Sequence, residues 1–337
     1  MTESRSRVWL ARPLFADISG RLDEHFDVIR SEPAGERYTS QEIAAHLTNA
    51  HGALVTLVER IGAAEIATAS KLRAVANVAV GYDNLDIPAL GERGIVVTNT
   101  PDVLTETTAD LGFALLLAAA RRITEAERWL REGQWRSWSF DTLLGHDLHG
   151  STLGILGMGR IGQGIARRAT GFGMRTLYHN RTRLPEAVER DCRARHVGFA
   201  ELLVQADHLL LALPYSPQTR HIIDAAALAR MKPTATLVNI ARGGIVDELA
   251  LADALAHGRL AAAGLDVYEG EPAVRPELLA LRNVVLTPHI ASASLGTRRA
   301  MVSLAVDNLI AALGCGPRAG RPPNVVNPGF IGNRPGA

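Results

Sequence analysis

The chain has 337 residues, with 36 lysines and arginines against 35 aspartates and glutamates and a formal net charge of +1. Two domains are expected at this length, and the balanced charge argues against nucleic acid or an anionic membrane as partner. Cys192 and Cys315 match no metal-ligand spacing, and residues 1–14 contain no apolar signal segment. We therefore expect a cytoplasmic protein with free thiols and no metal.

Short apolar runs alternate with amphipathic segments along the chain. Strands are predicted at 8–11, 27–30, 53–57, 74–79 and 95–98, with helices over 40–48 and 86–93. The apolar run 111–120 is too short to span a bilayer and predicts a buried helix. A second series of strands begins at Leu153 and continues at 176–178, 208–213, 236–239, 263–266 and 284–286, before a long helix over 292–313. This alternation predicts two parallel sheets covered by helices.

The first strand of the second series runs into a glycine pattern typical of dinucleotide binding. Gly157, Gly159 and Gly162 follow an apolar strand and precede a segment of good helix formers. In such a turn the first glycine allows the tight bend and the second lets a pyrophosphate approach the backbone. The third lets helix and strand pack closely, and the helix N-terminus attracts the phosphates.

The residues after the next strand bear on the choice of cofactor. Enzymes that use NAD place an acid there for the ribose 2′-hydroxyl, but no Asp or Glu occurs between Gly162 and Pro185. The chain has Asn180, Arg181, Thr182 and Arg183 instead. Guanidinium and hydroxyl donors suit a 2′-phosphate, so we expect NADPH to be preferred, with NADH possible. The alternative is that the two arginines belong to a solvated turn.

Three polar side chains stand at the ends of apolar stretches. Arg242 follows the strand at 236–239, Glu271 lies shortly after 263–266, and His289 follows 284–286. The carboxyl ends of parallel strands converge on one crevice, where ligands bind. A cation there can grip a carboxylate, and an imidazole held by an acid can carry a proton. Glu269, two residues from Glu271, is a competing candidate for the acid.

Several short motifs in one order carry a family resemblance. The chain resembles the D-isomer-specific 2-hydroxyacid dehydrogenases, and among them the glyoxylate/hydroxypyruvate reductases. The matching stretches are 78–86, 97–110, 153–164, 178–183, 239–244, 264–272 and 287–292. The resemblance implies a Rossmann-type nucleotide domain inserted into a flavodoxin-like substrate domain, both doubly wound α/β units, with the active site in the cleft. The expected boundaries are 1–102 plus 292–330 for the substrate domain, 103–291 for the nucleotide domain and 331–337 for a tail.

The same resemblance assigns roles to individual residues. Arg242 anchors the substrate carboxylate, His289 is the general acid, and the acid just before the proline, Glu271, keeps His289 charged. The resemblance implies cofactor contacts from Thr108, Gly157, Gly159, Arg160, Ile161, Gly162, Asn180, Arg181, Thr182, Leu213, Pro214, Ile240, Ala241 and Asp266. It implies substrate contacts from Leu57, Val80, Gly81, Ser292, Arg242 and His289.

The expected reaction is NADPH-dependent reduction of glyoxylate or hydroxypyruvate to the D-2-hydroxy acid. A 2-keto-gluconate-type reductase is an alternative, because such enzymes share these motifs. A dinucleotide-sensing regulator or corepressor of the same fold is another, since fold alone does not fix function. Trp129, Trp135 and Trp138 cluster in the segment that forms a dimer arm in the family. A homodimer is therefore expected.

Overall fold

The structure is a computed structural model that describes residues 5–33, 35 and 37–330. The predicted tail at 331–337 lies outside the described residues. The chain divides into two compact units. The smaller unit runs up to Leu104 and resumes at Ser294, and the larger unit is Thr105–Ala293. These divisions fall within two residues of the boundaries expected from the sequence.

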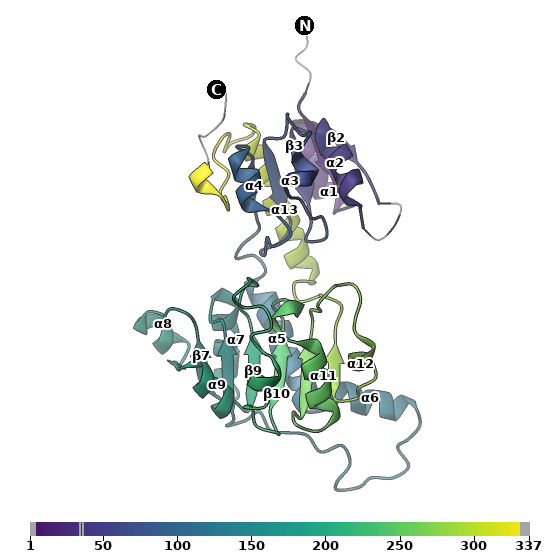
Figure 1. Cartoon of the computed structure of the whole chain (residues 1–337), viewed down its shortest axis with the longest axis vertical. Helices are drawn as coiled ribbons and strands as arrows, with labels where there is room; N and C mark the ends of the chain where they lie inside the picture. The colour runs from purple at the N-terminus through teal and green to yellow at the C-terminus, as the bar shows by residue number, and fades with distance from the viewer. Residues whose placement is uncertain (1–4, 34, 36, 331–337) are drawn as a thin grey trace. The chain divides into compact units, whose positions relative to one another are not determined.

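The smaller unit contains a five-stranded parallel sheet in the order β2-β1-β3-β4-β5, of which Figure 1 labels β2 and β3. Its strands are β1 (Arg7–Leu10), β2 (Asp27–Arg30), β3 (Gly52–Val55), β4 (Ala74–Asn77) and β5 (Val96–Thr98). Its helices are α1 (Ala16–Ser19), α2 (Ser40–Thr48), α3 (Ala63–Ile66), α4 (Ile87–Glu92) and α13 (Leu295–Ala312). This strand order is that of flavodoxin-like folds, as predicted.

Alternate strand residues in this sheet face opposite helical layers. Trp9, Val55 and Val75 share a buried cluster with residues of α2, α3 and α4, while α13 packs against β3, β4 and β5. Helix α2 occupies the predicted range and begins with a capping box between Thr39 and Glu42. Helix α13 is capped by Ser294 and is shorter at its start than the predicted 292–313.

The larger unit contains a seven-stranded parallel sheet in the order β12-β11-β10-β9-β6-β7-β8. Its strands are β6 (Thr152–Leu156), β7 (Arg175–His179), β8 (Ala194–His196), β9 (His208–Leu211), β10 (Thr236–Asn239), β11 (Ala262–Leu265) and β12 (Val284–Leu286). Its helices are α5 (Thr105–Ala120), α6 (Ile123–Arg131), α7 (Arg160–Thr170), α8 (Glu186–Asp191), α9 (Phe199–Gln205), α10 (Ala225–Leu228), α11 (Glu248–Ala256) and α12 (Pro276–Leu279).

Both faces of this sheet are covered, which confirms the doubly wound α/β class. Helices α5 and α7 share one buried cluster with Leu153 and Ile155. Helices α9 and α11 share the other with Leu209 and Leu237. The strand order reverses between β6 and β9, and the carboxyl ends beside such a reversal are where ligands bind in these folds. No helix in the described part of the chain is long and apolar enough to cross a membrane.

Candidate active site

The glycine turn lies at the strand reversal of the larger unit, directly after β6. Gly157 has a φ of +95°, and a Cβ there would meet the backbone N of Leu213, after β9, at 2.6 Å. A Cβ on Gly162 would meet the Gly157 carbonyl oxygen at 2.6 Å, whereas one on Gly159 would meet nothing within 4 Å. Gly157 and Gly162 are thus required by the turn itself, and Gly159 leaves open space at the start of α7. This geometry fits a pyrophosphate.

Residues 180–184, which directly follow β7, are the predicted binding loop for the 2′-phosphate and are called the phosphate loop below. The Asn180 Oδ1 atom accepts a hydrogen bond from the Met158 N–H at 2.7 Å, which ties this loop to the glycine turn. Arg181 and Thr182 are exposed, and among the described residues the Arg181 side chain has no hydrogen-bond or ion-pair partner. Arg183 differs, because its guanidinium forms a two-pronged pair with Glu189 on α8. The two arginines that the sequence presents as equivalent are therefore not equivalent.

The remaining predicted cofactor residues are distributed around the same edge of the sheet. Arg160 and Ile161 open α7, and Thr108 is buried in the first turns of α5. Leu213 and Pro214 follow β9, and the buried Ile240 and Ala241 follow β10. All belong to the larger unit.

Arg242 lies three residues beyond the end of β10, in a turn whose backbone is held by the Asn239 side chain. The Asn239 amide donates to the Arg242 carbonyl at 2.9 Å and accepts from the Ala241 N–H at 3.0 Å. The next residue must be glycine, because a Cβ on Gly243 would lie 1.8 Å from the Tyr268 carbonyl carbon and 2.1 Å from the Glu269 nitrogen. The missing side chain at Gly243 leaves room for the chain's own loop 268–271. Arg242 is thereby held beside the loop that bears Glu271.

His289 and Glu271 form a direct pair. The His289 Nδ1 atom lies 2.7 Å from Glu271 Oε2, while Glu271 Oε1 accepts the Tyr268 N–H at 2.9 Å. Burial alone would raise the pKa of Glu271, but the hydrogen bond and charge of His289, the Tyr268 N–H and the Arg242 charge together lower it. Glu271 is therefore a carboxylate at neutral pH. Its Oε2 atom accepts the Nδ1–H of His289 and so orients the imidazole ring. The Nε2 atom of His289 is left to act on a substrate.

Glu269, the competing acid, is held elsewhere. Its carboxylate lies 3.1 Å from His221 Nε2 and 3.6 Å from an Arg220 nitrogen, and its N–H donates to Glu248. Arg275 also lies within ion-pair distance of it, at 3.8 Å. Of the two acids, Glu271 is thus the partner of His289, as the family resemblance implied.

Asp266 holds the segment that carries His289. Its Oδ1 atom accepts the Ile290 N–H and the Thr287 hydroxyl, and its Oδ2 atom accepts the Ala291 N–H. His289 itself has a φ of +53°, a left-handed conformation that costs about 1–3 kcal/mol in a non-glycine residue. The fully buried Asp266 carboxylate supports this turn from inside. The sequence suggested a cofactor contact for Asp266 and did not indicate this supporting role.

Tyr268 is a second supporting residue that the sequence analysis did not single out. Its hydroxyl donates towards the Leu265 and Thr287 carbonyls, at 3.0 and 2.9 Å, which joins the ends of β11 and β12. Burial, with the charge of Asp266, raises the pKa of this phenol, which keeps it a neutral donor. The sequence feature that could have indicated this role is the position of Tyr268 between two predicted site residues, Asp266 and Glu271.

The predicted substrate residues Leu57, Val80 and Gly81 belong to the smaller unit, beyond the carboxyl ends of β3 and β4. Amide side chains hold this loop: Asn99 donates to the Val80 carbonyl at 2.8 Å, and Asn77 donates to the Gly81 carbonyl at 3.1 Å. Within residues 5–33, 35 and 37–330, the N–H groups of Val80 and Gly81 donate no hydrogen bond. They are thus available to an anion. Ser292 belongs to the larger unit, three residues after His289.

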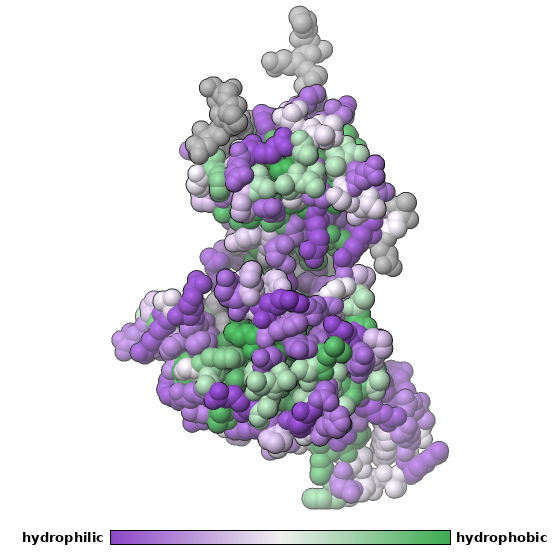
Figure 2. Space-filling view, viewed as in Figure 1, coloured by the Kyte–Doolittle hydropathy of each residue, from purple (hydrophilic) through white to green (hydrophobic). Residues whose placement is uncertain are grey.

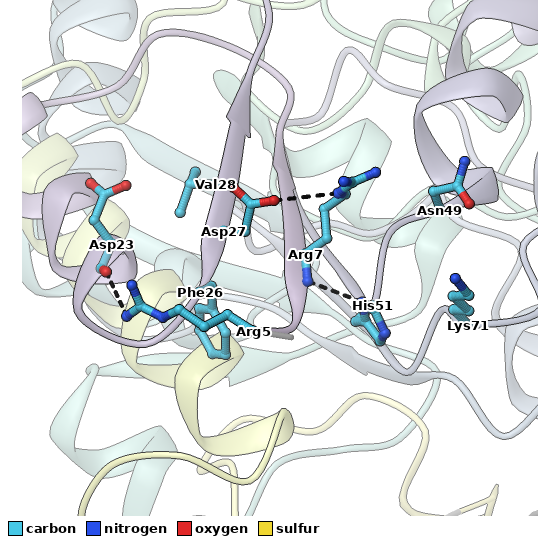
Figure 3. A pocket seen from close by; sticks show the side chains of 9 residues that line it. All are labelled: Arg5, Arg7, Asp23, Phe26, Asp27, Val28, Asn49, His51 and Lys71. Carbon is cyan, nitrogen blue, oxygen red and sulfur yellow. Dashed lines mark hydrogen bonds and ion pairs between the residues drawn. The ribbon is translucent and has the colours of Figure 1, made fainter. Parts of the chain in front are cut away.

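A cavity of about 600 Å³ is lined by residues of the smaller unit alone. It opens at the amino ends of β1 and β2, where Arg7 pairs with Asp27 and the His51 ring accepts the Arg7 N–H (Figure 3). Leu57, Val80 and Gly81 lie at the opposite, carboxyl ends of the strands. None of the predicted site residues lines this cavity, so it is not the candidate active site.

The fold and the site define a class. Residues 113–291 match the family described as D-isomer specific 2-hydroxyacid dehydrogenase, NAD binding domain. The chain belongs to this family and is an NAD(P)-dependent dehydrogenase. It is 48% identical to a glyoxylate reductase of Thermococcus gammatolerans, over 91% of this chain and 92% of that one. It is 50% identical to a glyoxylate reductase of Pyrococcus horikoshii, over 91% of each chain.

A solved structure from Sinorhizobium meliloti is similar over most of its length. That protein is described as an NADPH-dependent glyoxylate/hydroxypyruvate reductase in complex with NADP and malonate. It matches with a TM-score of 0.82 and 39% identity, over 91% of this chain and 93% of the other.

Proposed function

We propose that this chain uses NADPH to reduce a small 2-oxo acid, either glyoxylate to glycolate or hydroxypyruvate to its D-2-hydroxy acid. The observation that carries the proposal is the 2.7 Å pair of His289 and Glu271, beside Arg242, on strand ends of the nucleotide-binding unit. An imidazole oriented by a carboxylate is suited to general acid catalysis. The proposed substrates are those of the similar proteins, which are described as glyoxylate or glyoxylate/hydroxypyruvate reductases.

Each protein group has a defined task in this reaction. When bound, the nicotinamide supplies the hydride to C2 of the oxo acid. Arg242 grips the substrate carboxylate, and its charge stabilises the developing oxyanion. Protonated His289 donates its Nε2 proton to the carbonyl oxygen, while the Glu271 carboxylate stabilises the imidazolium before transfer. In the smaller unit, the Val80 and Gly81 N–H groups offer hydrogen-bond donors to an anionic group.

The preference for NADPH rests on the loop after β7. Arg181 is exposed and has no hydrogen-bond or ion-pair partner in the described part of the chain, Thr182 adds a hydroxyl, and residues 180–183 contain no acid. A 2′-phosphate would offer Arg181 charge-assisted hydrogen bonds. Sequence similarity to glyoxylate reductases and structural similarity to an enzyme solved with NADP support this assignment.

The experiment that tests the substrate class is a panel followed by NADPH absorbance. Glyoxylate and hydroxypyruvate should be reduced, and glycolaldehyde, which has a carbonyl but no carboxylate, should not. A 2-keto-gluconate arm separates the alternative reductase. A protein that binds NADPH but reduces none of the oxo acids would support the regulator of the same fold and contradict the proposal.

We also propose a homodimer formed through α6 and the segment after it, in a cytoplasmic protein. Trp135, Trp138 and Phe140 are 56%, 75% and 86% exposed, and no residue of α6 is buried. Green and pale side chains lie along this segment in Figure 2, which Figure 1 places beside α6. Such large apolar side chains suit an interface. Mass measurement in solution should give twice the chain mass, and a monomer at micromolar concentration would contradict it.

A further inference from the structure

Arg183 is engaged within the protein although it lies in the phosphate loop. Its Nε atom donates to Glu189 Oε1 at 2.9 Å and its Nη2 atom to Oε2 at 2.7 Å. Such parallel bonds use one whole edge of the guanidinium. The Glu189 side chain is only 8% exposed, whereas that of Arg183 is 65% exposed. The arginine therefore covers a carboxylate that would otherwise lie unbalanced beside the loop.

Glu189 also organises the loop through Tyr178. The Tyr178 hydroxyl, which is buried, donates to Glu189 Oε1 at 2.6 Å and accepts the Leu184 N–H at 2.9 Å. Leu184 ends the phosphate loop, whose start is fixed by the bond between Asn180 and the Met158 N–H. Arg183, Glu189 and Tyr178 thus form a clamp on the far end of the loop.

The ionisation states agree with this geometry. The hydrogen bonds of Arg183 and Tyr178 lower the pKa of Glu189 to about 2. Burial and the neighbouring Glu189 raise the pKa of Tyr178 to about 12. The clamp therefore contains one carboxylate, one guanidinium and one neutral phenol throughout the neutral range.

We propose that Arg183 is a positioning residue that neutralises Glu189 and fixes the loop, and that Arg181 alone supplies the guanidinium for the 2′-phosphate. This inference rests on the proposed use of NADPH. It makes a specific electrostatic prediction. Removing Arg183 leaves the Glu189 carboxylate uncompensated near the phosphate, so binding should weaken through repulsion and not through a lost contact. Neutralising Glu189 as well should then restore binding.

The test compares Arg183→Met, Glu189→Gln and the double variant. Calorimetry would measure the affinities for 2′,5′-ADP and for 5′-AMP, which differ by the 2′-phosphate. Arg183→Met should weaken 2′,5′-ADP selectively, on the order of tenfold at low salt. Glu189→Gln alone should stay within about threefold of the unmodified protein, because glutamine still accepts from Tyr178. The double variant should return to within about threefold as well.

The matched control is a second Arg–Glu pair on the same helix. Arg190 and Glu186 lie 3.2 Å apart with both side chains exposed, and Arg190→Met should leave both affinities unchanged. Thermal melts identify any variant that fails to fold. If Arg183→Met is such a variant, the affinities of Glu189→Gln and of the double variant can still be compared, and they show the effect of removing the Arg183 charge when position 189 is neutral.

Three results would overturn the clamp. A double variant as weak as Arg183→Met would show that repulsion by Glu189 is not what weakens binding, and it would overturn the proposed neutralising role of Arg183. Unchanged affinities in the Arg183→Met protein would show that Arg183 does not position the loop. An unmodified protein that binds 5′-AMP as tightly as 2′,5′-ADP would refute both the clamp and the preference for NADPH, whereas failure of the rescue alone refutes only the clamp.

Discussion

Gly243→Ala tests whether the Arg242 loop and the Glu271 loop are positioned by their contact with each other. The added Cβ would lie 1.8 Å from the Tyr268 carbonyl carbon and 2.1 Å from the Glu269 nitrogen. Both atoms belong to backbone, so they cannot rotate away. Reaching 3.4 Å, where ordinary contact begins, requires the loops to separate by about 1.6 Å. Since a misplacement of about 1 Å can cost 10²-fold in rate, we expect kcat/KM to fall by about 10²-fold or more.

The assay is NADPH oxidation with glyoxylate, accompanied by thermal melts. Such a clash also destabilises the fold, typically by about 1–3 kcal/mol, so activity is compared at a temperature where the variant is folded. The three atoms nearest to a Cβ added at Gly244 belong to the Tyr215 ring, the closest at 2.9 Å, so Gly244→Ala should be affected less because a side chain can move. Gly198→Ala meets nothing within 4 Å and is the matched control. A folded Gly243→Ala protein with kcat/KM within about threefold of the unmodified enzyme would refute this reasoning.

Further predictions concern the reacting groups and the cofactor. His289→Ala should retain NADPH binding but lose about 10²–10⁴-fold in turnover, and near-normal turnover would exclude it as proton donor. Arg242→Ala should raise KM for glyoxylate and lower kcat, because it contacts both the carboxylate and the reacting carbonyl; a change in neither would remove its role. The lowered pKa of Glu271 means that its ionised form stabilises the fold above its unfolded pKa of about 4.3, and that this contribution is lost as pH falls through the lower folded value. The melting-temperature difference between the unmodified protein and Glu271→Gln should therefore shrink as the pH falls below the unfolded pKa of about 4.3, and a difference independent of pH would contradict the pair. Arg181→Ala should weaken NADPH by about one to two powers of ten and spare NADH, since a charge-assisted hydrogen bond contributes roughly 1.5–3 kcal/mol; equal weakening of both would place Arg181 in a solvated turn.

The parallel sheets and their order of elements could be predicted because buried strands and glycine turns have local signatures. The range 40–48 matches α2 since Thr39 and Glu42 form its capping box. The weakly apolar edge strand β8 was not predicted, because an edge strand buries little and its residues 194–196 lack an apolar run. Helix α6 was missed for a similar reason, since it buries no residue.

The site divides in the same way. Arg242, Glu271 and His289 could be proposed as candidates from the sequence because each stands at a strand end in a recognisable motif. The support of His289 by Asp266 and the engagement of Arg183 by Glu189 depend on contacts across 24 and 6 positions, which side-chain geometry alone establishes. The role of Gly243 likewise depends on a loop 25 residues further along the chain.

The central claim is most directly tested by the catalytic efficiency of the unmodified protein with glyoxylate, measured with NADPH and with NADH at one fixed salt concentration. We predict measurable reduction with both cofactors or with NADPH alone, a higher kcat/KM for NADPH, and glycolate as the product. Absence of turnover with both cofactors would contradict the proposed reductase activity. A higher kcat/KM with NADH would contradict the hypothesis that Arg181 binds the 2′-phosphate.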